Sequence, residues 1–273
     1  YITAFNSNMV ANESFLDSAT LRENVVSLAR NIGYVPRSRT AAKANITFTV
    51  DVSSAATQLI LKAGLVCVGA VDNTQYTFSI PGDVSANVVN NQATFTNLDI
   101  HQGTYLTKQF IVDTSQDQRF ILNNSNIDTE TLNVRVGTRE FKQVDNIVTV
   151  NKESEIYLLQ EVADEKYELL FGDGIIGKKL ETGTVINVSY IVTDGTSGNG
   201  PSLFSYAGTT TDSNGILVTP SSSISVTTNQ SATGGGDIEK ISSIKYFAPR
   251  VYSSQYRAVT ARDYEAIIQQ IFP

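Results

Sequence analysis

The feature that most constrains the fold is the hydrophobic period, which is two residues over most of the chain. From about Ala44 to Ser231, apolar residues alternate with polar ones, as at Ile46, Phe48 and Val50. The same alternation returns at Tyr76, Phe78 and Ile80 and at Ile186, Val188, Tyr190 and Val192. Such alternation predicts strands with one face buried. We therefore expect a mainly β protein, built as a β-sandwich or as mixed antiparallel β domains, with helical N- and C-terminal flanks.

Composition and charge agree with this class and exclude others. The sequence is rich in Thr, Ser and Asn, which suit pleated surfaces and turns. Acidic residues outnumber basic ones, 27 to 20, and the formal net charge is −7. Binding to nucleic-acid phosphates needs clustered Lys and Arg, so a nucleic-acid partner is not expected. No apolar run approaches the length of a membrane span, so no membrane partner is expected either.

Changes of pattern divide the chain into four segments. Residues 1–43 are expected to be a helical N-terminal segment, and residues 44–195 a β region with a weak internal boundary near 113–126. Residues 196–236 are rich in Gly, Ser and Thr and are expected to form an extended connection. Residues 237–273 are expected to be helical and to be the truncated start of a C-terminal domain.

The N-terminal segment carries an apolar stripe at helical spacing. Leu21, Val25, Leu28 and Ile32 recur with a period close to 3.6. We expect the helix to start with a capping box formed by Thr20 and Glu23 and to end at Gly33, which can adopt a left-handed conformation. The stripe could dock on the β region of the same chain or on a partner chain, and the pattern leaves both open.

The C-terminal segment shows two further helical patterns. Asp237 is expected to cap a helix that Pro249 ends. A second helix is expected to begin at Thr260 and Asp263 and to carry Tyr264, Ile267, Ile268 and Ile271. Directly before the first helix, Gly234, Gly235 and Gly236 predict a flexible hinge.

A glycine pattern in the β region resembles a dinucleotide-binding motif but lacks its context. Gly172, Gly174 and Gly177 fit the spacing G-x-G-x-x-G. A dinucleotide site needs a helix to begin at the glycines, whereas here another alternating strand follows within a few residues. We therefore interpret the three glycines as a turn between two strands, shaped as a hairpin.

Neither metal sites nor catalytic groups emerge from the sequence, and no cofactor is expected. His101 is the only histidine and Cys67 the only cysteine, so paired ligands of these types cannot be formed. Asp113, Ser115 and Asp117 have the spacing of a calcium loop, but the glycine and glutamate that such a loop requires are missing. A hydrolase would need two carboxyl groups facing each other in a cleft, which leaves no trace in sequence. We expect no enzymatic activity.

Arginines near tyrosines at both ends suggest protein contacts as an alternative to a solvated face. The candidates for contact residues, from both flanks, are Phe15, Leu21, Val25, Leu28, Ile32, Arg37, Arg39, Arg250, Tyr256, Arg257, Tyr264, Ile267 and Ile268.

Five ordered blocks together resemble a known family. They are NESFLDSATLRENVVSLARNIGYVPRSRTAA, LILKAG, FGDGIIGKKLETGTVINVSYIVTDGTSGNG, the GGGD linker and YSSQYRAVTARDYEAIIQQIF. In this order they resemble the baseplate wedge proteins of T-even-type contractile-tailed phages, in the baseplate J-like family. Family members begin earlier and continue further than this chain, so it is expected to be a piece of a longer protein.

The resemblance implies a structural role in the virion, with assembly in the host cytoplasm. Such a protein would form the inner ring of the baseplate around the tail tube and link wedges during assembly and sheath contraction. Its implied partners are a second copy of itself and other wedge subunits, including a larger wedge subunit and the sheath-initiator protein. The composition alone also fits a β-sandwich tail module that binds a receptor or a carbohydrate, and an exposed aromatic platform beside a carboxylate would favour that alternative.

Overall fold

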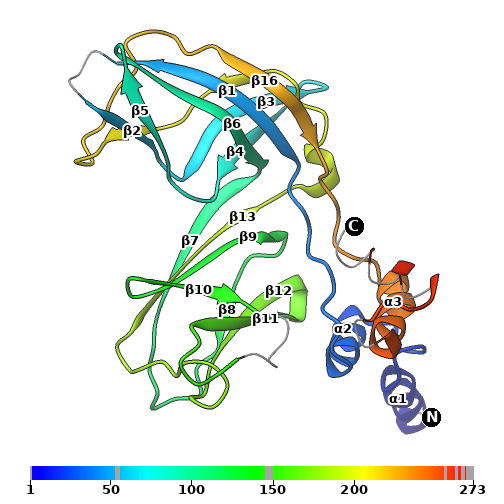
Figure 1. The fold of residues 1–273 in the computed structure, drawn as a ribbon. Helices are drawn as coiled ribbons and strands as arrows, with labels where there is room; N and C mark the ends of the chain where they lie inside the picture. The colour runs from blue at the N-terminus through cyan, green and yellow to red at the C-terminus, as the bar shows by residue number, and fades with distance from the viewer. Residues whose placement is uncertain are drawn as a thin grey trace.

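The computed structural model describes residues 2–52, 56–144, 150–254, 257–261, 264–265 and 268, with side chains from Asn6 onward. Two β units and a helical end make up the molecule, and Figure 1 shows the helical end beside the β units. The two flanks of the chain meet in this helical end, so that the described N- and C-terminal helices are neighbours. The expected class, mainly β with helical flanks, is confirmed. Among the described residues, no helix has the length and apolar character of a membrane span.

The first β unit combines strands from two distant parts of the sequence. Its strands are β1 (Lys43–Asp51), β2 (Gln58–Leu61), β3 (Gly64–Val71), β4 (Thr74–Ile80), β5 (Val84–Val89), β6 (Gln92–Gln102), β14 (Phe204–Tyr206), β15 (Thr210–Asp212) and β16 (Val226–Thr233). The strand order is β14-β3-β4-β6-β5-β2-β15, and β1 lies between β6 and β16. The long strand β6 pairs antiparallel with β1, β4 and β5, which folds the sheet into two layers around one core.

Period-two alternation places the core of the first unit as predicted. Along β1, every second residue from Ala44 to Val50 is buried. Phe48 stacks on Phe95 of β6 with ring centroids 5.1 Å apart, a favourable distance for aromatic pairs. Cys67 is buried in this core, and burial raises the pKa of its thiol to about 12.

The second β unit is a seven-stranded sheet formed by one continuous stretch of chain. Its strands are β7 (Thr104–Ile111), β8 (Phe120–Leu122), β9 (Ile127–Val136), β10 (Arg139–Gln143), β11 (Ile156–Val162), β12 (Lys166–Phe171) and β13 (Val185–Val192), with short 3-10 turns η2 (Ala163–Glu165) and η3 (Gly195–Gly198). Their order is β7-β13-β9-β10-β11-β12-β8, and among the described strands only β10 and β11 pair in parallel. Phe110 and Phe120, on the two edge strands, meet with ring centroids 5.6 Å apart, so the sheet curls around its own core.

The two β units join at Gly103, between β6 and β7. Gly103 has φ +135°, and a Cβ there would lie 2.3 Å from the carbonyl oxygen of Val192. Only glycine fits this close crossing of two backbones. The division thus falls earlier than the weak boundary expected near 113–126, which lies between β7 and β8 of one unit. A single glycine inside an alternating run gave no sign of it.

The segment 196–236 returns to the first unit instead of only bridging two parts. It supplies β14, β15 and β16, and Ala232 belongs to the buried core. Within this segment, Thr211 and Leu217 form an antiparallel bridge. Some of its polar residues, such as Ser205 and Thr227, occupy exposed strand positions, whereas Thr210 is buried.

The helices are α1 (Ile2–Glu13), α2 (Arg22–Asn31) and α3 (Ile241–Ser254). The predicted capping box at Thr20 and Glu23 is wrong, since no side chain caps α2. The Thr20 hydroxyl instead donates to Glu13 Oε1 at 2.6 Å, and the same oxygen accepts from the Thr20 amide at 2.8 Å. The carboxylate of Glu13, at the end of α1, thus accepts both hydrogen bonds from Thr20. Gly33, with φ +80°, follows the end of α2 as predicted.

The C-terminal helix differs from the prediction at both ends. It begins at Ile241, and Asp237 lies outside it, in the connection that precedes the helix. Pro249 lies inside α3, which continues to Ser254, because Ala248 and Val251 on either side of the proline are held in an apolar cluster. Tyr256, Asp263, Ile267 and Ile271 lie outside the described residues.

Candidate functional site

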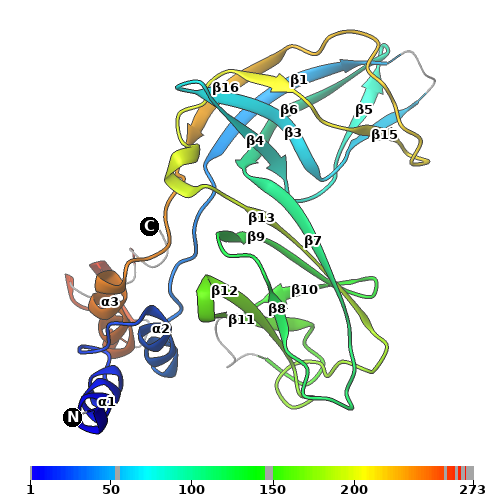
Figure 2. The same ribbon diagram turned by 180° about the vertical axis from the view of Figure 1, so that it is seen from behind.

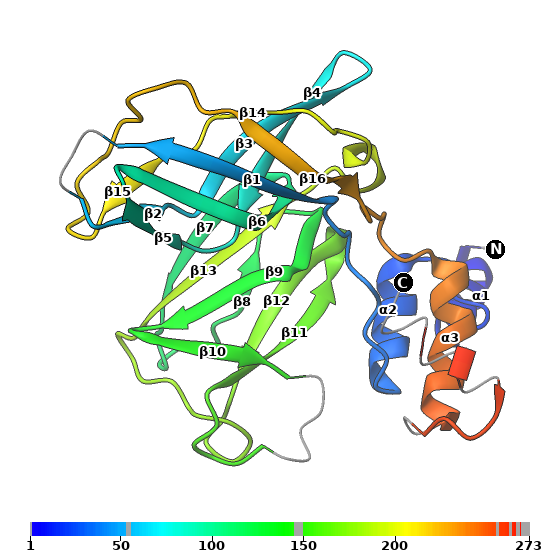
Figure 3. The same cartoon turned by 45° about the horizontal axis from the view of Figure 1, so that its top comes forward.

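The helical end contains parts of both flanks of the chain, where the sequence analysis placed the candidate contact residues. Figure 2 shows α2 and α3 close together beside the second β unit, with α1 extending outward. In Figure 3 the same two helices lie side by side. Two connections, 35–42 and 234–240, join these helices to the β units, and Thr40 and Gly236 form an antiparallel bridge between them.

A small apolar cluster holds α2 against α3. Its buried members are Ala19, Val25, Val26, Ala29, Tyr34, Ile244, Ala248 and Val251. Leu28 and Ile32, two candidates for contacts, are half-buried against it. The stripe of α2 therefore docks on another helix of the same chain, and Val25 is fully buried there. The sequence pattern left open whether the stripe docks on the β region of the same chain or on a partner chain. Contact with a partner chain remains a prediction.

Other apolar candidates remain on the surface of the helical end. Phe15 is 67% exposed and Leu21 is 54% exposed. Tyr264 and Ile268 are also about half exposed. Exposed apolar side chains on neighbouring segments are typical of surfaces that bind other proteins. Tyr256 and Ile267 cannot be added to this surface, because they lie outside the described residues.

The arginine candidates occupy different surroundings. The guanidinium carbon of Arg250 lies 3.5 Å from the centre of the Tyr246 ring, a cation–π contact. Arg39 Nη1 lies 3.8 Å from Asp237 Oδ1. Arg37 is half-buried and Arg257 is exposed. The structure thus brings Arg37 and Arg39 into the connection to the β units, and leaves Arg250 and Arg257 on α3 and after it.

Arg22 fixes the helical end to the second β unit. Its Nε donates to Glu161 Oε1 at 2.7 Å and its Nη2 to Glu161 Oε2 at 3.0 Å. It also donates to the carbonyl oxygen of Glu239. The Glu161 side chain is nearly fully buried on β11, and burial raises its pKa although the contact with Arg22 opposes the rise. Two parallel charge-assisted bonds of this kind set both distance and orientation.

Glu239 organises the entry into α3. Its carboxylate is buried and accepts from the Tyr34 hydroxyl at 2.8 Å, the Arg37 amide at 3.0 Å and the Ser243 hydroxyl at 2.6 Å. Burial, with the nearby charge of Glu239, raises the pKa of Tyr34. One carboxylate thus joins the end of α2, the connection that follows it and the first turn of α3.

Asp128 holds the same connection further along. It is buried on β9, where its oxygens accept from the amides of Ala41 at 2.9 Å and Glu130 at 3.0 Å. Burial raises its pKa to about 6, although the two amide bonds oppose the rise. The hydroxyls of Ser38 and Thr129 lie 2.8 Å apart in the same contact. The path from α2 to β1 is therefore fastened to the second β unit.

The glycine motif forms a loop between strands that are not neighbours. β12 and β13 are separated by three strands in the sheet, so the predicted hairpin is wrong, although the turn is present. A Cβ on Gly172 would lie 2.2 Å from the carbonyl carbon of Gly177, and Gly174 has φ +95°. Asp173 Oδ1 accepts from the amides of two following residues, at 2.8 and 2.9 Å. The loop thus closes on itself, and no helix begins at the glycines.

The three glycines before α3 are held by neighbours on both sides. The amides of Thr40 and Gly236 each donate to the other's carbonyl oxygen at 3.0 Å. Asn199 donates to the Gly235 carbonyl at 3.0 Å and accepts from its amide at 2.8 Å. A hinge at Gly234, Gly235 and Gly236 remains a prediction, and bending there would break these bonds.

Neither a metal site nor a reactive group stands out in the part of the chain that is described. Among those residues, no three His, Cys, Asp or Glu side chains are placed to share a metal ion. Asp113 Oδ1 accepts from the Ser115 amide and hydroxyl at 3.0 and 2.6 Å, an ordinary turn. His101 is mostly buried, and this burial lowers its pKa.

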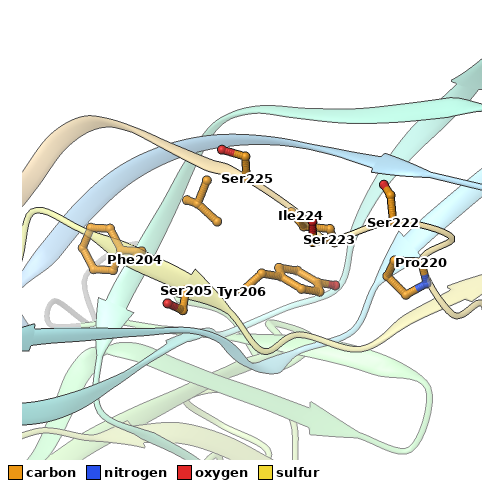
Figure 4. A pocket seen from close by; sticks show the side chains of 9 residues that line it. Phe204, Ser205, Tyr206, Pro220, Ser222, Ser223, Ile224 and Ser225 are labelled. Atoms are coloured by element: carbon orange, nitrogen blue, oxygen red, sulfur yellow. The ribbon is translucent and has the colours of Figure 1, made fainter.

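Two surface hollows are large enough to be considered as binding sites. One, of about 550 Å³, lies between the β units and includes Asp83 and Arg135 in its lining. The other, of about 520 Å³, lies beside β14 and is lined by Phe204, Tyr206, Ile224 and several serines (Figure 4). The second has no charged lining residue, so it lacks the carboxylate expected beside an aromatic platform in a carbohydrate site.

Sequence reasoning missed Arg22, Asp128, Glu161 and Glu239 as organising residues. A signal existed for Glu161, because it falls on the inward parity of β11, two residues after buried Leu159. An acidic residue at an inward position needs a partner. Its partner lies 139 positions away in the sequence, so the pair itself could not be found.

Comparisons with known proteins agree with the blocks recognised in the sequence. Residues 106–195, almost all of the second β unit, match the family described as bacteriophage baseplate wedge protein gp6, third domain. Baseplate wedge protein gp6 of Enterobacteria phage T4 is 29% identical over 299 positions, covering 100% of this chain. The chain is similar to the phage baseplate wedge proteins. The predicted resemblance is thereby confirmed.

The chain spans 44% of the length of the T4 protein. A chain of the anti-feeding prophage (AFP) baseplate, from a 6-fold symmetrised cryo-EM structure, aligns with 98% of this chain and 50% of its own length. The identity is 14% and the TM-score 0.33.

Proposed function

We propose that this chain is a structural subunit of a phage tail baseplate wedge, located in the virion, that acts by assembly and performs no covalent chemistry. The observation that carries the proposal is the alignment with the T4 wedge protein over the full length of this chain. A match confined to one β domain would fit any tail module. This one includes both helical flanks and both β units in the same order.

We further propose that the chain lies in the inner ring around the tail tube, where it links wedges during assembly and sheath contraction. The partners would be a second copy, other wedge subunits including a larger one, and the sheath-initiator protein. Exposed Phe15 and Leu21 support such contacts at the helical end. Membrane and nucleic-acid partners have no part in the proposal.

The mechanism would be mechanical. Arg22 and Asp128 join the helical end and its connection to the second β unit through buried charged or polar contacts, and Glu239 holds α2 and α3 together. A displacement of the helices is then transmitted to the sheets, because bending the connection would leave buried carboxylates without their donors. A part that must pass a movement from one neighbour to another needs such stiffness.

The experiment compares two variants of the full-length wedge protein. Replacing Phe15 and Leu21 together by Asp should leave the fold unchanged, because both side chains are exposed, and should abolish incorporation into wedges. Replacing Val89 by Asp, on the distant β5 hairpin where Val89 is 65% exposed, is the control and should leave incorporation unchanged. Sedimentation of reconstituted wedges measures both. Normal incorporation of the double variant would contradict the proposed contact surface.

The alternative, a β-sandwich module that binds a receptor or carbohydrate, is supported less. Its expected sign was an exposed aromatic platform beside a carboxylate. The hollow beside β14 has Phe204 and Tyr206 but no acidic lining residue, and Tyr206 packs against Phe48 with ring centroids 5.1 Å apart.

A further inference from the structure

The first β unit has an open seam between two strand edges. Among the described residues, β14 forms a ladder with β3 alone, and β16 with β1 alone. At one end the two edges are joined, because the Gly200 amide donates to the Ala232 carbonyl at 2.8 Å and the Ala232 amide donates to the Pro201 carbonyl at 2.9 Å. Towards residues 206 and 224 they part, and the hollow of about 520 Å³ opens between them.

The side chains along this seam alternate on both edges. On β14, Phe204 and Tyr206 face the core while Ser205 is exposed. On the opposite edge, Ile224 and Val226 pack against the same core. Figure 4 shows Tyr206 and Ile224 lying between the two edges. The floor of the seam is thus the edge of the hydrophobic core, and its rims carry serines.

We propose that this seam, the β14–β16 groove, receives a short extended segment of another protein chain by strand addition. The edge of β14 and the chain that leads into β16, residues 220–225, part over an apolar floor and can offer backbone donors and acceptors to such a segment. The lining contains Pro, Ser, Phe, Tyr, Ile and Val and no charged residue. The segment must therefore be uncharged, because a charge placed there would lose water without gaining a partner.

The geometry also sets the pattern of the segment. Successive residues of an added strand point to opposite faces, so every second residue would lie over Phe204, Tyr206 and Ile224, and would be apolar. The residues between them would face solvent beside the serines. This site lies in the first β unit, away from the helical end, and does not depend on the proposed baseplate role.

The test measures binding of a capped seven-residue peptide, in which Val alternates with Thr, by fluorescence anisotropy with the complete chain. Saturable binding is expected. Methylating the amide nitrogens on one edge of the peptide should weaken binding about tenfold or more, because two or three backbone hydrogen bonds are lost. A peptide of the same composition with all Val residues first should bind at least as poorly. Absence of saturable binding, or equal binding of the methylated peptide, would overturn the proposal.

Two protein variants and two other occupants complete the test. Ile224→Ser should weaken binding severalfold, whereas Ile216→Ser, at a 64% exposed position outside the groove, should not. Circular dichroism checks that both remain folded, and the methylated peptide tests the site without any change to the protein. Self-association of the chain that Ile224→Ser abolishes would make a second copy the occupant, and saturable binding of maltohexaose with the same sensitivity would make it a sugar. Either result would overturn strand addition by a different chain.

Discussion

Arg22 at the start of α2 and Glu161 on β11 form a two-bond ion pair, at 2.7 and 3.0 Å, across 139 positions of sequence. The carboxylate is nearly fully buried and the guanidinium largely so. A pair this deep contributes through its geometry and not through net stability, because both charges have left water. It defines where the helical end sits on the second β unit.

The first prediction concerns this pair. Arg22→Ala leaves the Glu161 carboxylate buried without its cation, and should lower the free energy of unfolding by about 3 kcal/mol or more. Arg139→Ala is the matched control: Arg139 pairs with Glu155 but is 65% exposed, so its loss should cost less than about 1 kcal/mol. Urea unfolding measures both. Equal losses would mean that burial does not distinguish the two pairs.

Replacing both partners gives a sharper result. Arg22→Leu together with Glu161→Leu should recover much of the lost stability, because no buried charge remains. The position of the helical end should nevertheless become less defined, which faster amide exchange in α2 would detect.

The second prediction is a pH dependence due to Asp128. Its pKa is raised from 3.8 to about 6 in the folded state, so between these values the folded protein binds a proton that the unfolded chain lacks. The free energy of unfolding should therefore fall as pH rises from about 4 to about 6, by up to about 3 kcal/mol. Lys43 and Glu130, which also face this carboxylate, act in opposite directions on its pKa. Urea unfolding at several pH values, compared with Asp128→Asn, isolates this contribution.

Asp51 provides the control with the opposite sign. Hydrogen bonds from Ser222 and Gln92 lower its pKa, so its contribution is present above the unfolded pKa and is lost as pH falls. Asp51→Asn should remove that loss and leave the slope between about 4 and 6 unchanged. A wild-type protein whose slope matches that of Asp128→Asn would contradict the assignment.

How far the sequence predicted this molecule depends on the range of each interaction. The alternation at Ile46, Phe48 and Val50 follows from local side-chain direction, and those strands and their buried face were predictable. The capping box at Thr20 failed because Glu13, seven positions earlier, offered a better acceptor after the chain turned. Pro249 was expected to end a helix, but contacts with α2, more than 200 positions away, override its local effect.

The candidate site was predicted in outline only. Apolar periodicity correctly marked α2 as amphipathic, but a period cannot say which surface the stripe will meet, and here it is α3. The buried contacts of Glu161 and Glu239 join residues more than 130 positions apart, and no local pattern encodes such pairing. Recognition of the family needed only the order of the blocks, and it did not need the geometry.

The third prediction concerns the loop between β12 and β13. Gly172→Ala would put a Cβ 2.2 Å from the Gly177 carbonyl carbon, so the backbone must move and stability should fall by about 2 kcal/mol or more. A Cβ on Gly82 would have no atom within 4 Å, so Gly82→Ala should change stability by less than about 0.5 kcal/mol. Thermal unfolding distinguishes them, and a stable Gly172→Ala protein would show that the loop can open without loss.

The last prediction concerns the glycines before α3. A free hinge would tolerate alanine at each of the three positions. The structure instead predicts different effects of alanine at the adjacent residues Gly234 and Gly235. Gly234 has φ +80°, and no atom lies within 4 Å of the place that a Cβ would take, so Gly234→Ala should cost only about 1 kcal/mol of backbone strain. A Cβ on Gly235 would lie 2.4 Å from the Gly195 carbonyl oxygen, so Gly235→Ala should separate the crossing segments.

Hydrogen exchange at the Thr40 and Gly236 amides gives the readout, because these amides form the bridge between the two connections. Gly235→Ala should speed exchange at both amides by about tenfold or more, as expected when a bond worth about 1 kcal/mol or more is lost, and Gly234→Ala should leave it nearly unchanged. If both variants exchange like the wild type, the contact with Gly195 does not hold the joint. If both exchange faster to the same extent, the three glycines act as one flexible hinge, as their composition alone suggested.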